Sequence, residues 1–181
     1  MRSNTRVAIL DAAVRLVSTE RGARITLEAA AREAGVTKPG LMYHFPTKEA
    51  LMLAVVGHVA DRWEQRMLQA LGVSFEQASP AMRIRAYVES CTESIDRGEF
   101  AIFADAVYRP ALSGPWVERF QRWFELPPSL SAPERARLTL VRLAADGLWV
   151  ADSTSVLAPA PEDRAALLAE MRALLDPAVG P

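Results

Sequence analysis

Four polar side chains near the start of the chain could contact a polyanion. Lys38 and Lys48 supply positive charge, and Tyr43 and His44 end in polar groups that can donate hydrogen bonds to phosphate oxygens. Pro39 and Gly40 follow Lys38 and carry little side-chain bulk, so the backbone there can come close to a bound molecule. These residue types at this spacing indicate binding of a polyanion and do not resemble a catalytic set.

Local sequence signals predict two short helices that would position these side chains. Thr26 is a hydroxyl N-cap for an Ala-rich helix ending near Ala34, and Gly35 follows where a left-handed residue is favoured. Thr37 then caps a second helix, with Pro39 in its first turn. A helix, a Gly-containing turn and a second helix form a helix-turn-helix, whose second helix can lie in the DNA major groove.

The helix-turn-helix assigns different contacts to the two lysines. Lys38 lies at the N-terminal end of the second helix, the end that meets base edges in this geometry. Thr47 caps the next helix, and Lys48 in its first turn lies beside backbone N–H groups, which suits a phosphate. The candidate DNA-binding residues are Thr26, Thr37, Lys38, Pro39, Gly40, Tyr43, His44 and Lys48.

This stretch resembles the DNA-binding domain of the TetR family of bacterial transcriptional repressors. Pro39 departs from the family pattern, in which a polar or small residue is common, and this leaves the base preference open. Residues 143–149 are similar to a late segment of some members. The matching residues of the DNA-binding stretch are Thr26, Ala30, Ala34-Gly35-Val36-Thr37, Gly40, Leu41, Tyr43-His44-Phe45 and Lys48-Glu49-Ala50-Leu51.

The resemblance implies an all-α fold of about nine helices. Residues 1–47 would form a three-helix DNA-binding domain, and residues 48–181 a helical ligand-binding and dimerisation domain. It further implies a repressor that binds an inverted-repeat operator in double-stranded DNA as a homodimer and is released by a small apolar or aromatic effector. The alternative is a DNA-binding regulator without a small-molecule ligand, controlled by a protein partner or constitutive.

The apolar pattern beyond Leu51 is helical, without the alternation typical of strands. A long fourth helix is expected from Lys48 to about Leu71, ended by Gly72. We expect Arg97-Gly98 to end the fifth helix and Pro110 to end the sixth. The later helices are expected over about residues 80–96, 99–107, 115–125, 131–152 and 162–175.

The distribution of charge supports nucleic-acid binding although the formal net charge is −1. Residues 1–48 hold eight Arg and Lys against four Asp and Glu, and the remainder holds 13 against 18. A basic end on a mildly acidic body is typical of a DNA-binding protein with a separate sensing or assembly domain.

Several other classes of protein find little support in the sequence. Cys91 is the single cysteine, which excludes an intramolecular disulfide or a cysteine zinc site. His44 and His58 lack acids at metal-ligand spacing, and no nucleophile elbow or phosphate-binding loop is present, so we expect no enzyme, metal or cofactor. Asp11 and Arg15 interrupt any secretion signal, and no apolar run could span a membrane, so we expect a cytoplasmic protein.

Large apolar and aromatic residues in the middle helices form either a core or a ligand pocket, and for any one residue the core is the more frequent case. Asp105 and Asp146 interrupt apolar stretches, so each needs a partner, which could be Arg109, Arg142 or a ligand. The candidate ligand-binding residues are Trp63, Met67, Tyr87, Phe103, Asp105, Phe120, Trp123, Asp146 and Trp149.

The last two helices have the pattern of an assembly surface. The final helix carries a broad apolar stripe, and the helix before it carries small residues at helical spacing, which would let another helix approach. Burial inside the monomer is the alternative. The family resemblance favours a dimer in which these helices and their symmetry mates form a four-helix bundle. The candidate interface residues are Ala144, Gly147, Ala151, Leu167, Met171 and Leu174.

Overall fold

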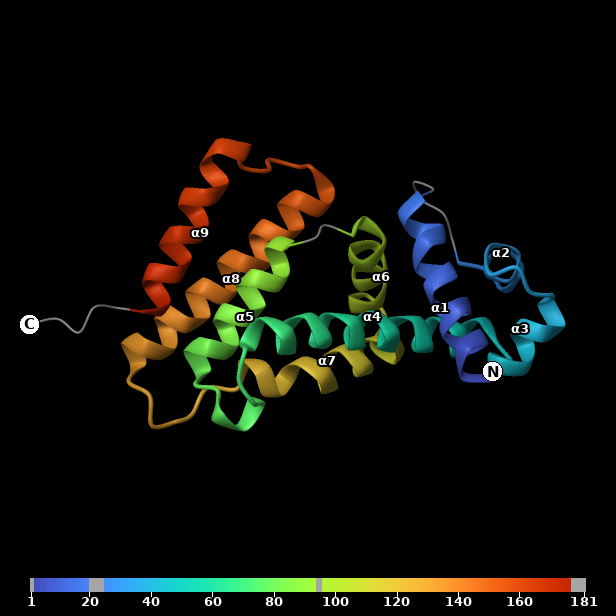
Figure 1. Cartoon of the computed structure of the whole chain (residues 1–181), viewed down its shortest axis with the longest axis horizontal. Helices are drawn as coiled ribbons and strands as arrows, with labels where there is room; N and C mark the ends of the chain where they lie inside the picture. Colours follow the sequence, from blue (N-terminus) through green and yellow to red (C-terminus); the bar gives the residue numbers. More distant parts are fainter. Residues whose placement is uncertain (1, 20–24, 94–95, 177–181) are drawn as a thin grey trace, which may run out of the picture. The chain divides into compact units, whose positions relative to one another are not determined.

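The computed structural model describes residues 2–19, 25–93 and 96–176 (Figure 1). Within these residues all regular elements are helical, which confirms the all-α class and the nine expected helices. The α-helices are α1 (Arg2–Thr19), α2 (Leu27–Glu33), α3 (Lys38–His44), α4 (Lys48–Leu71), α5 (Pro80–Glu93), α6 (Arg97–Val107), α7 (Pro110–Phe124), α8 (Ala132–Thr154) and α9 (Pro161–Leu175), with a short 3-10 helix η1 (Phe75–Gln77).

The expected end of the fifth helix at Arg97-Gly98 was wrong. Arg97 and Gly98 instead open α6, because Asp96 is an N-cap for that helix. Its carboxylate accepts hydrogen bonds from the backbone N–H of Gly98 at 2.8 Å and of Glu99 at 3.3 Å. Gly98 therefore belongs to the capped first turn of α6, although it was interpreted as the end of the preceding helix.

The start of α7 also differs from the expectation. Pro110 was expected to end the sixth helix, but it opens α7, and Pro115 lies inside that helix instead of opening it. A proline fits the first turn of a helix because the missing N–H has no intrahelical partner there. Pro110 therefore starts a helix five residues earlier than the sequence pattern indicated.

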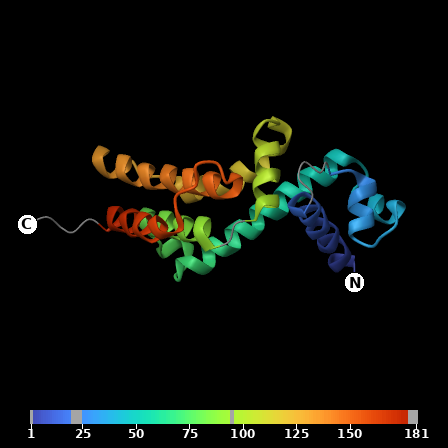
Figure 2. The ribbon, with the colours of Figure 1, turned by 90° about the horizontal axis from the view of Figure 1, so that it is seen from above.

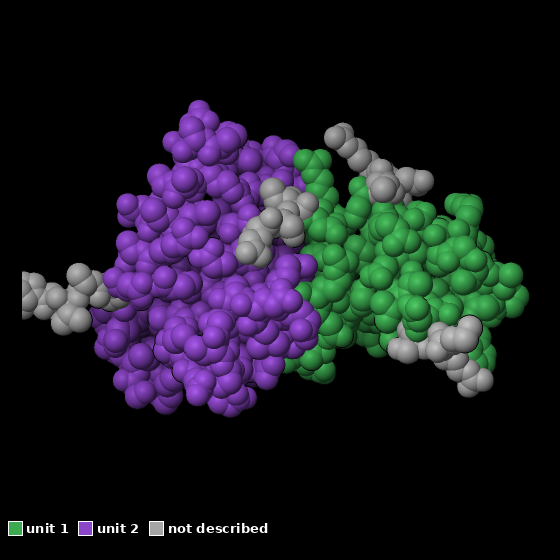
Figure 3. All heavy atoms as spheres, in the orientation of Figure 1, with its two compact units in different colours: residues 1–62, 96–119 green, residues 63–95, 120–181 purple. Residues whose placement is uncertain are grey.

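The chain forms two compact units (Figure 3). Unit 1 comprises residues 1–62 and 96–119, and unit 2 comprises residues 63–95 and 120–181. The division falls within α4 and within α7, so the first unit combines α1, α2 and α3 with α6. The expected division into a DNA-binding domain (residues 1–47) and a ligand-binding and dimerisation domain (residues 48–181) is a division by function, and it stays a prediction.

In unit 1, α1 packs against α2 and α6, and α2 packs against α3. The contact between α1 and α6 is close at Gly98, where an added Cβ would lie 2.0 Å from Ser18 Oγ and 2.8 Å from the Val14 carbonyl oxygen. Ser18 Oγ also donates a hydrogen bond to Asp96 Oδ1 at 2.9 Å. A residue without a side chain is therefore needed at position 98 for this packing.

In unit 2, α5 packs against α8 and α9, and α8 packs against α9 (Figure 2). Arg172 on α9 makes two hydrogen bonds to the Glu89 carboxylate on α5, at 2.8 and 2.7 Å. Large side chains from α4, α7 and α8 fill the interior of this unit, among them Trp63, Trp123 and Trp149. In the part of the chain that the structure describes, no helix is both long and apolar enough to cross a membrane.

Candidate functional site

Threonine hydroxyls fix the starts of three consecutive helices at the candidate DNA-binding end. Thr26 Oγ1 accepts a hydrogen bond from the backbone N–H of Ala29 at 3.1 Å, and thereby caps α2. Thr37 Oγ1 accepts from the N–H of Gly40 at 3.1 Å, at the start of α3. Thr47 Oγ1 accepts from the N–H of Ala50 at 3.0 Å, at the start of α4. Each cap satisfies an N–H that the helix leaves without an intrahelical partner.

The turn between α2 and α3 has the predicted left-handed glycine. Gly35 has a φ of +66°, a conformation in which most L-residues are strained. The backbone N–H of Val36 donates to the Ala31 carbonyl at 2.9 Å, which closes the end of α2. The helix-turn-helix therefore forms as the sequence predicted, from local hydrogen bonds.

The two sides of α3 differ sharply in exposure. Leu41 and Phe45 are buried, which confirms the prediction that they anchor the helix. Tyr43 is 71% exposed, and its ring meets the half-buried ring of His44 edge-on at 5.3 Å. The candidate residues at the start of α3, Thr37, Lys38, Pro39 and Gly40, are also exposed, whereas Thr26 is half-buried. This exposed side could meet a DNA groove without disturbing the core.

Lys38 has an ion-pair partner that the sequence did not reveal. Its ammonium group hydrogen-bonds to the Glu28 carboxylate on α2. That hydrogen bond lowers the pKa of Glu28 below its ordinary value. The two residues lie on different helices, so helix periodicity could not pair them. Glu28 therefore holds Lys38 at the N-terminal end of α3.

The candidate ligand-binding residues are divided between the two units. Phe103 and Asp105 belong to unit 1, and the other seven belong to unit 2. Phe103 contacts the ring of Trp116 at 5.0 Å. Asp105 is half-exposed and pairs at 2.9 Å with Arg109, which follows the end of α6, so the pair that the sequence suggested is present.

In unit 2 the aromatic candidates are buried and contact one another. Trp63 meets Trp149 edge-on at 5.1 Å and lies 6.2 Å from the ring of Tyr87. Tyr87 donates a hydrogen bond to Asp146 Oδ1, and Arg142 donates to Oδ2 at 2.7 Å. Burial, assisted by Asp146, raises the pKa of Tyr87 well above its ordinary value. Asp146 thus has internal partners without requiring a ligand.

The remaining unit 2 candidates also serve the core. Trp123 is fully buried, and its Nε1 donates to the buried carboxylate of Glu64 at 3.0 Å. Arg122 donates to the same carboxylate oxygen at 2.7 Å. Met67 and Phe120 are buried as well. Trp123 therefore helps satisfy a buried charge, a role that composition did not indicate.

The candidate assembly residues lie mostly on an open surface. On α8, Leu140 and Leu143 are 57% and 52% exposed, and Ala144 and Gly147 on the same side are exposed too. A Cβ added at Gly147 would meet nothing within 4 Å. On α9, Leu167 and Leu174 are exposed, whereas Met171 is buried; Ala151 of α8 is half-buried.

Two family matches identify the chain. Residues 9–55 match the family described as bacterial regulatory proteins, tetR family. Residues 81–176, more than half of the chain, match the tetracyclin repressor-like C-terminal domain. The chain belongs to the TetR family. Together the matches cover the helix-turn-helix and most of the later helices.

Curated relatives in this family are HTH-type transcriptional regulators. The chain is 30% identical to EthR of Mycolicibacterium smegmatis over 135 residues, and this alignment covers 72% of the chain and 60% of EthR. It is 38% identical over 81 residues to RutR of Escherichia coli K12, covering 45% of this chain and 36% of RutR. The alignments thus span less than two thirds of either relative.

Solved structures share the fold across most of the chain. The multidrug binding protein EbrR complexed with imidazole superposes with a TM-score of 0.65 and 22% identity, covering 93% of each chain. Its complex with malachite green gives a TM-score of 0.66, also at 22% identity, covering 93% of this chain and 96% of EbrR. At this identity the likeness establishes the fold.

Proposed function

We propose that this protein is a transcriptional regulator that binds double-stranded DNA through α3. The observation that carries the proposal is the pair of opposite faces on this helix. Leu41 and Phe45 anchor one side in the unit 1 core, while Tyr43 stands exposed on the other and Lys38 is exposed at the N-terminal end of the helix. Lys48, exposed in the first turn of α4, adds a cation suited to a backbone phosphate. Such a regulator would act in the cytoplasm.

We further propose a homodimer that uses the exposed faces of α8 and α9. Leu140, Leu143 and Leu167 expose apolar surface, and Gly147 leaves room for a helix to approach. Large apolar surfaces of this kind are typical of protein interfaces. Two copies related by a two-fold axis would place their α3 helices about 34–36 Å apart, which fits an inverted-repeat operator.

For control of DNA binding, the leading proposal is release of the operator by a small apolar or aromatic effector. It is supported by the aromatic cluster of unit 2 and by the bound molecules in the EbrR structures. The helix α4 carries Lys48 at its start and Trp63 and Met67 further along, so a ligand against the later residues could act on this helix. A coupling of about 1–3 kcal/mol is typical of such regulation.

The alternative is a DNA-binding regulator without a small-molecule ligand. The close ring contacts of Trp63 with Trp149 and Tyr87 favour it, because they occupy the interior that a ligand would need. The internal pairs of Asp105 and Asp146 favour it as well, since neither acid requires a ligand as a counter-charge.

Selection of duplexes from a random library tests DNA binding and dimerisation together. We expect the chosen duplexes to contain an inverted repeat and to bind two chains by light scattering. Tyr43→Ala is the matched variant, because it alters the exposed face of α3 without touching the core. Failure to select any sequence, or binding of one chain per duplex, would contradict the proposal.

The effector is tested by adding malachite green and imidazole to the protein–operator complex. A ligand that releases DNA must itself bind more weakly when the operator is present, by the same factor, because the coupling is reciprocal. Titration of the dye with and without operator measures that factor. Equal dye affinity in both titrations, together with no release of DNA, favours the regulator without a ligand.

A further inference from the structure

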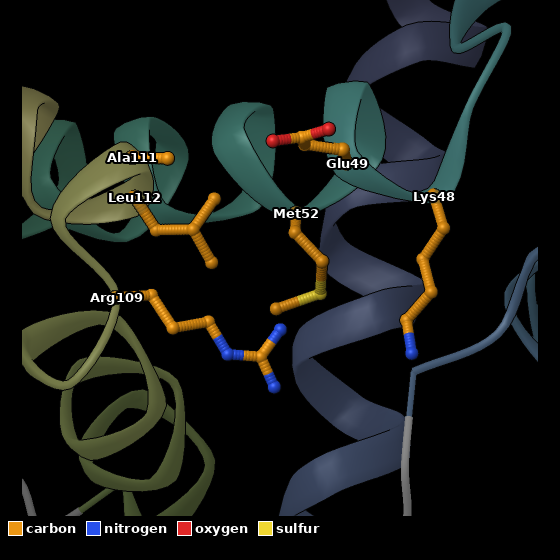
Figure 4. Close-up of a pocket in the computed structure, with 6 residues that line it drawn as sticks. All are labelled: Lys48, Glu49, Met52, Arg109, Ala111 and Leu112. Atoms are coloured by element: carbon orange, nitrogen blue, oxygen red, sulfur yellow. The ribbon is translucent and has the colours of Figure 1, made fainter.

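A hollow in unit 1 is lined by residues that the sequence did not assign to a ligand. Its volume is about 320 Å³, and it lies between the first turns of α4 and α7 (Figure 4). The lining residues are Lys48, Glu49, Met52, Arg109, Ala111 and Leu112. A volume of this size accommodates a small organic molecule.

The cationic groups of the hollow lie on both sides of an apolar floor. The floor is formed by Met52 and Leu112, which are buried, and both side chains point into the hollow in Figure 4. The Arg109 guanidinium points toward the same space, and Lys48 extends beside Met52. Lys48 opens α4 and Arg109 lies between α6 and α7, so the fold brings together charges that are distant in the sequence.

The acidic groups near the hollow leave cationic donors available. Asp105 accepts from one guanidinium nitrogen of Arg109 at 2.9 Å, and this arginine has five N–H donors in all. In the view of Figure 4, the Glu49 carboxylate and the Arg109 guanidinium lie on opposite sides of Met52. The hollow also faces the starts of α4 and α7, where helix dipoles favour negative charge. An anion therefore fits better than a cation.

We propose that this hollow binds a small organic monoanion with an apolar body, such as an aromatic or short-chain carboxylate. The carboxylate would accept hydrogen bonds from Arg109 and Lys48, and the apolar body would cover Met52 and Leu112. The site is distinct from the aromatic cluster of unit 2, because all of its lining residues belong to unit 1.

Occupancy of this site would weaken DNA binding directly. Lys48 is the residue assigned above to a DNA phosphate, and an anion in the hollow would draw the same ammonium group away from DNA. This consequence rests on the proposed function, whereas anion binding itself does not. The two can be measured separately.

The test follows the methionine methyl groups by NMR in protein labelled at the methionine ε-carbon. Met52→Leu assigns the reporter resonance, and benzoate is titrated beside benzamide and benzylammonium at constant chloride. We expect benzoate alone to move the Met52 signal saturably. Arg109→Gln and Lys48→Gln should each weaken benzoate binding about tenfold, or roughly 1.4 kcal/mol.

Arg15→Gln is the matched control. Its side chain is 55% exposed and paired with Glu33, and that of Arg109 is 54% exposed and paired with Asp105, but Arg15 does not line the hollow. The proposal is overturned if the Met52 signal does not move, if benzamide moves it equally, or if Arg109→Gln and Arg15→Gln behave alike. Movement confined to the Met67 and Met171 signals of unit 2 also overturns it.

A second measurement adds benzoate to the complex with a selected operator duplex. Weaker DNA binding in the wild type, but not in Arg109→Gln, supports competition for Lys48. Because the NMR titration contains no DNA, its failure overturns the anion site and leaves the proposed function standing. Failure to bind any duplex overturns the proposed function and leaves the anion site standing.

Discussion

Two aromatic side chains, one in each unit, occupy opposite environments. Tyr43 on α3 of unit 1 is 71% exposed, whereas Trp123 on α7 of unit 2 is fully buried and bound to Glu64. Tyr43 contributes little to its own core, so its hydroxyl and ring remain available to another molecule. Trp123 is already committed to the fold. The comparison shows that the surroundings of an aromatic residue, more than its presence, separate a binding surface from a core.

The largest expected effect follows from this difference in burial. Trp123→Ala should reduce the free energy of unfolding by about 3–5 kcal/mol, because it removes a buried ring and leaves Glu64 with fewer donors. Tyr43→Ala should change it by no more than about 0.5 kcal/mol. Urea denaturation followed by circular dichroism measures both. Equal stabilities of the two variants would contradict the contrast.

This expectation limits the use of Trp123 as a probe of ligand binding. Loss of an effector in Trp123→Ala would not separate a lost contact from a damaged unit 2. Trp149→Phe keeps an aromatic ring against Trp63 and is the gentler variant for that purpose.

A second contrast concerns two glycines. Gly98→Ala should destabilise the protein by about 1–3 kcal/mol, because the new Cβ would collide with the Val14 carbonyl oxygen of α1. Gly147→Ala meets no neighbouring atom and should stabilise α8 by about 0.5–1 kcal/mol. Thermal unfolding of dilute protein measures the two shifts. Tolerance of alanine at position 98 would refute the close packing of α1 on α6.

A larger side chain at the second glycine tests assembly. A Cβ at position 147 meets no atom of the monomer within 4 Å. Overpacking by Gly147→Leu should therefore cost about 1–3 kcal/mol only in dimer formation and in operator binding. Sedimentation over a range of protein concentrations measures the dimer constant. Ala70→Leu, an exposed change on α4, is the control. An unchanged dimer in Gly147→Leu would remove α8 from the proposed interface.

The smallest expected effect concerns the phosphate contact. Lys48→Ala should reduce the slope of log affinity against log salt concentration by about 1, because one fewer counterion is released on binding. Tyr43→Phe removes a hydroxyl group without a charge, so it should weaken binding and leave the slope unchanged. Titrations on one selected duplex at several salt concentrations measure both variants. An unchanged slope in Lys48→Ala would exclude its phosphate role.

The helix-turn-helix could be predicted because its determinants are local. The caps at Thr26 and Thr37 and the left-handed Gly35 each act within a few residues of the chain. Leu41 and Phe45 share a face through helix geometry alone. These features therefore appear in the sequence as spacing, and the structure reproduces them.

The parts that the sequence did not predict depend on distant residues. Gly98 was interpreted as a helix stop, because its close contact with Val14 on α1 is invisible until the chain has folded. The pairing of Lys38 with Glu28 joins two helices, and the hollow beside Lys48 requires Arg109 from a later segment. The core role of Trp123 depends on Glu64, which lies on another helix.

The contact between α1 and α6 also has a consequence for synthesis on the ribosome. Ser18 and Asp96 are 78 residues apart in the chain, so the nascent α1 emerges long before the residues that pack against it. At about 5–20 residues per second, the delay is roughly 4–16 s. During that interval the surface of α1 around Val14 has not yet packed against Gly98. A shortened gene product that ends before α6 would therefore carry α3 without the helix that packs on α1 and completes unit 1.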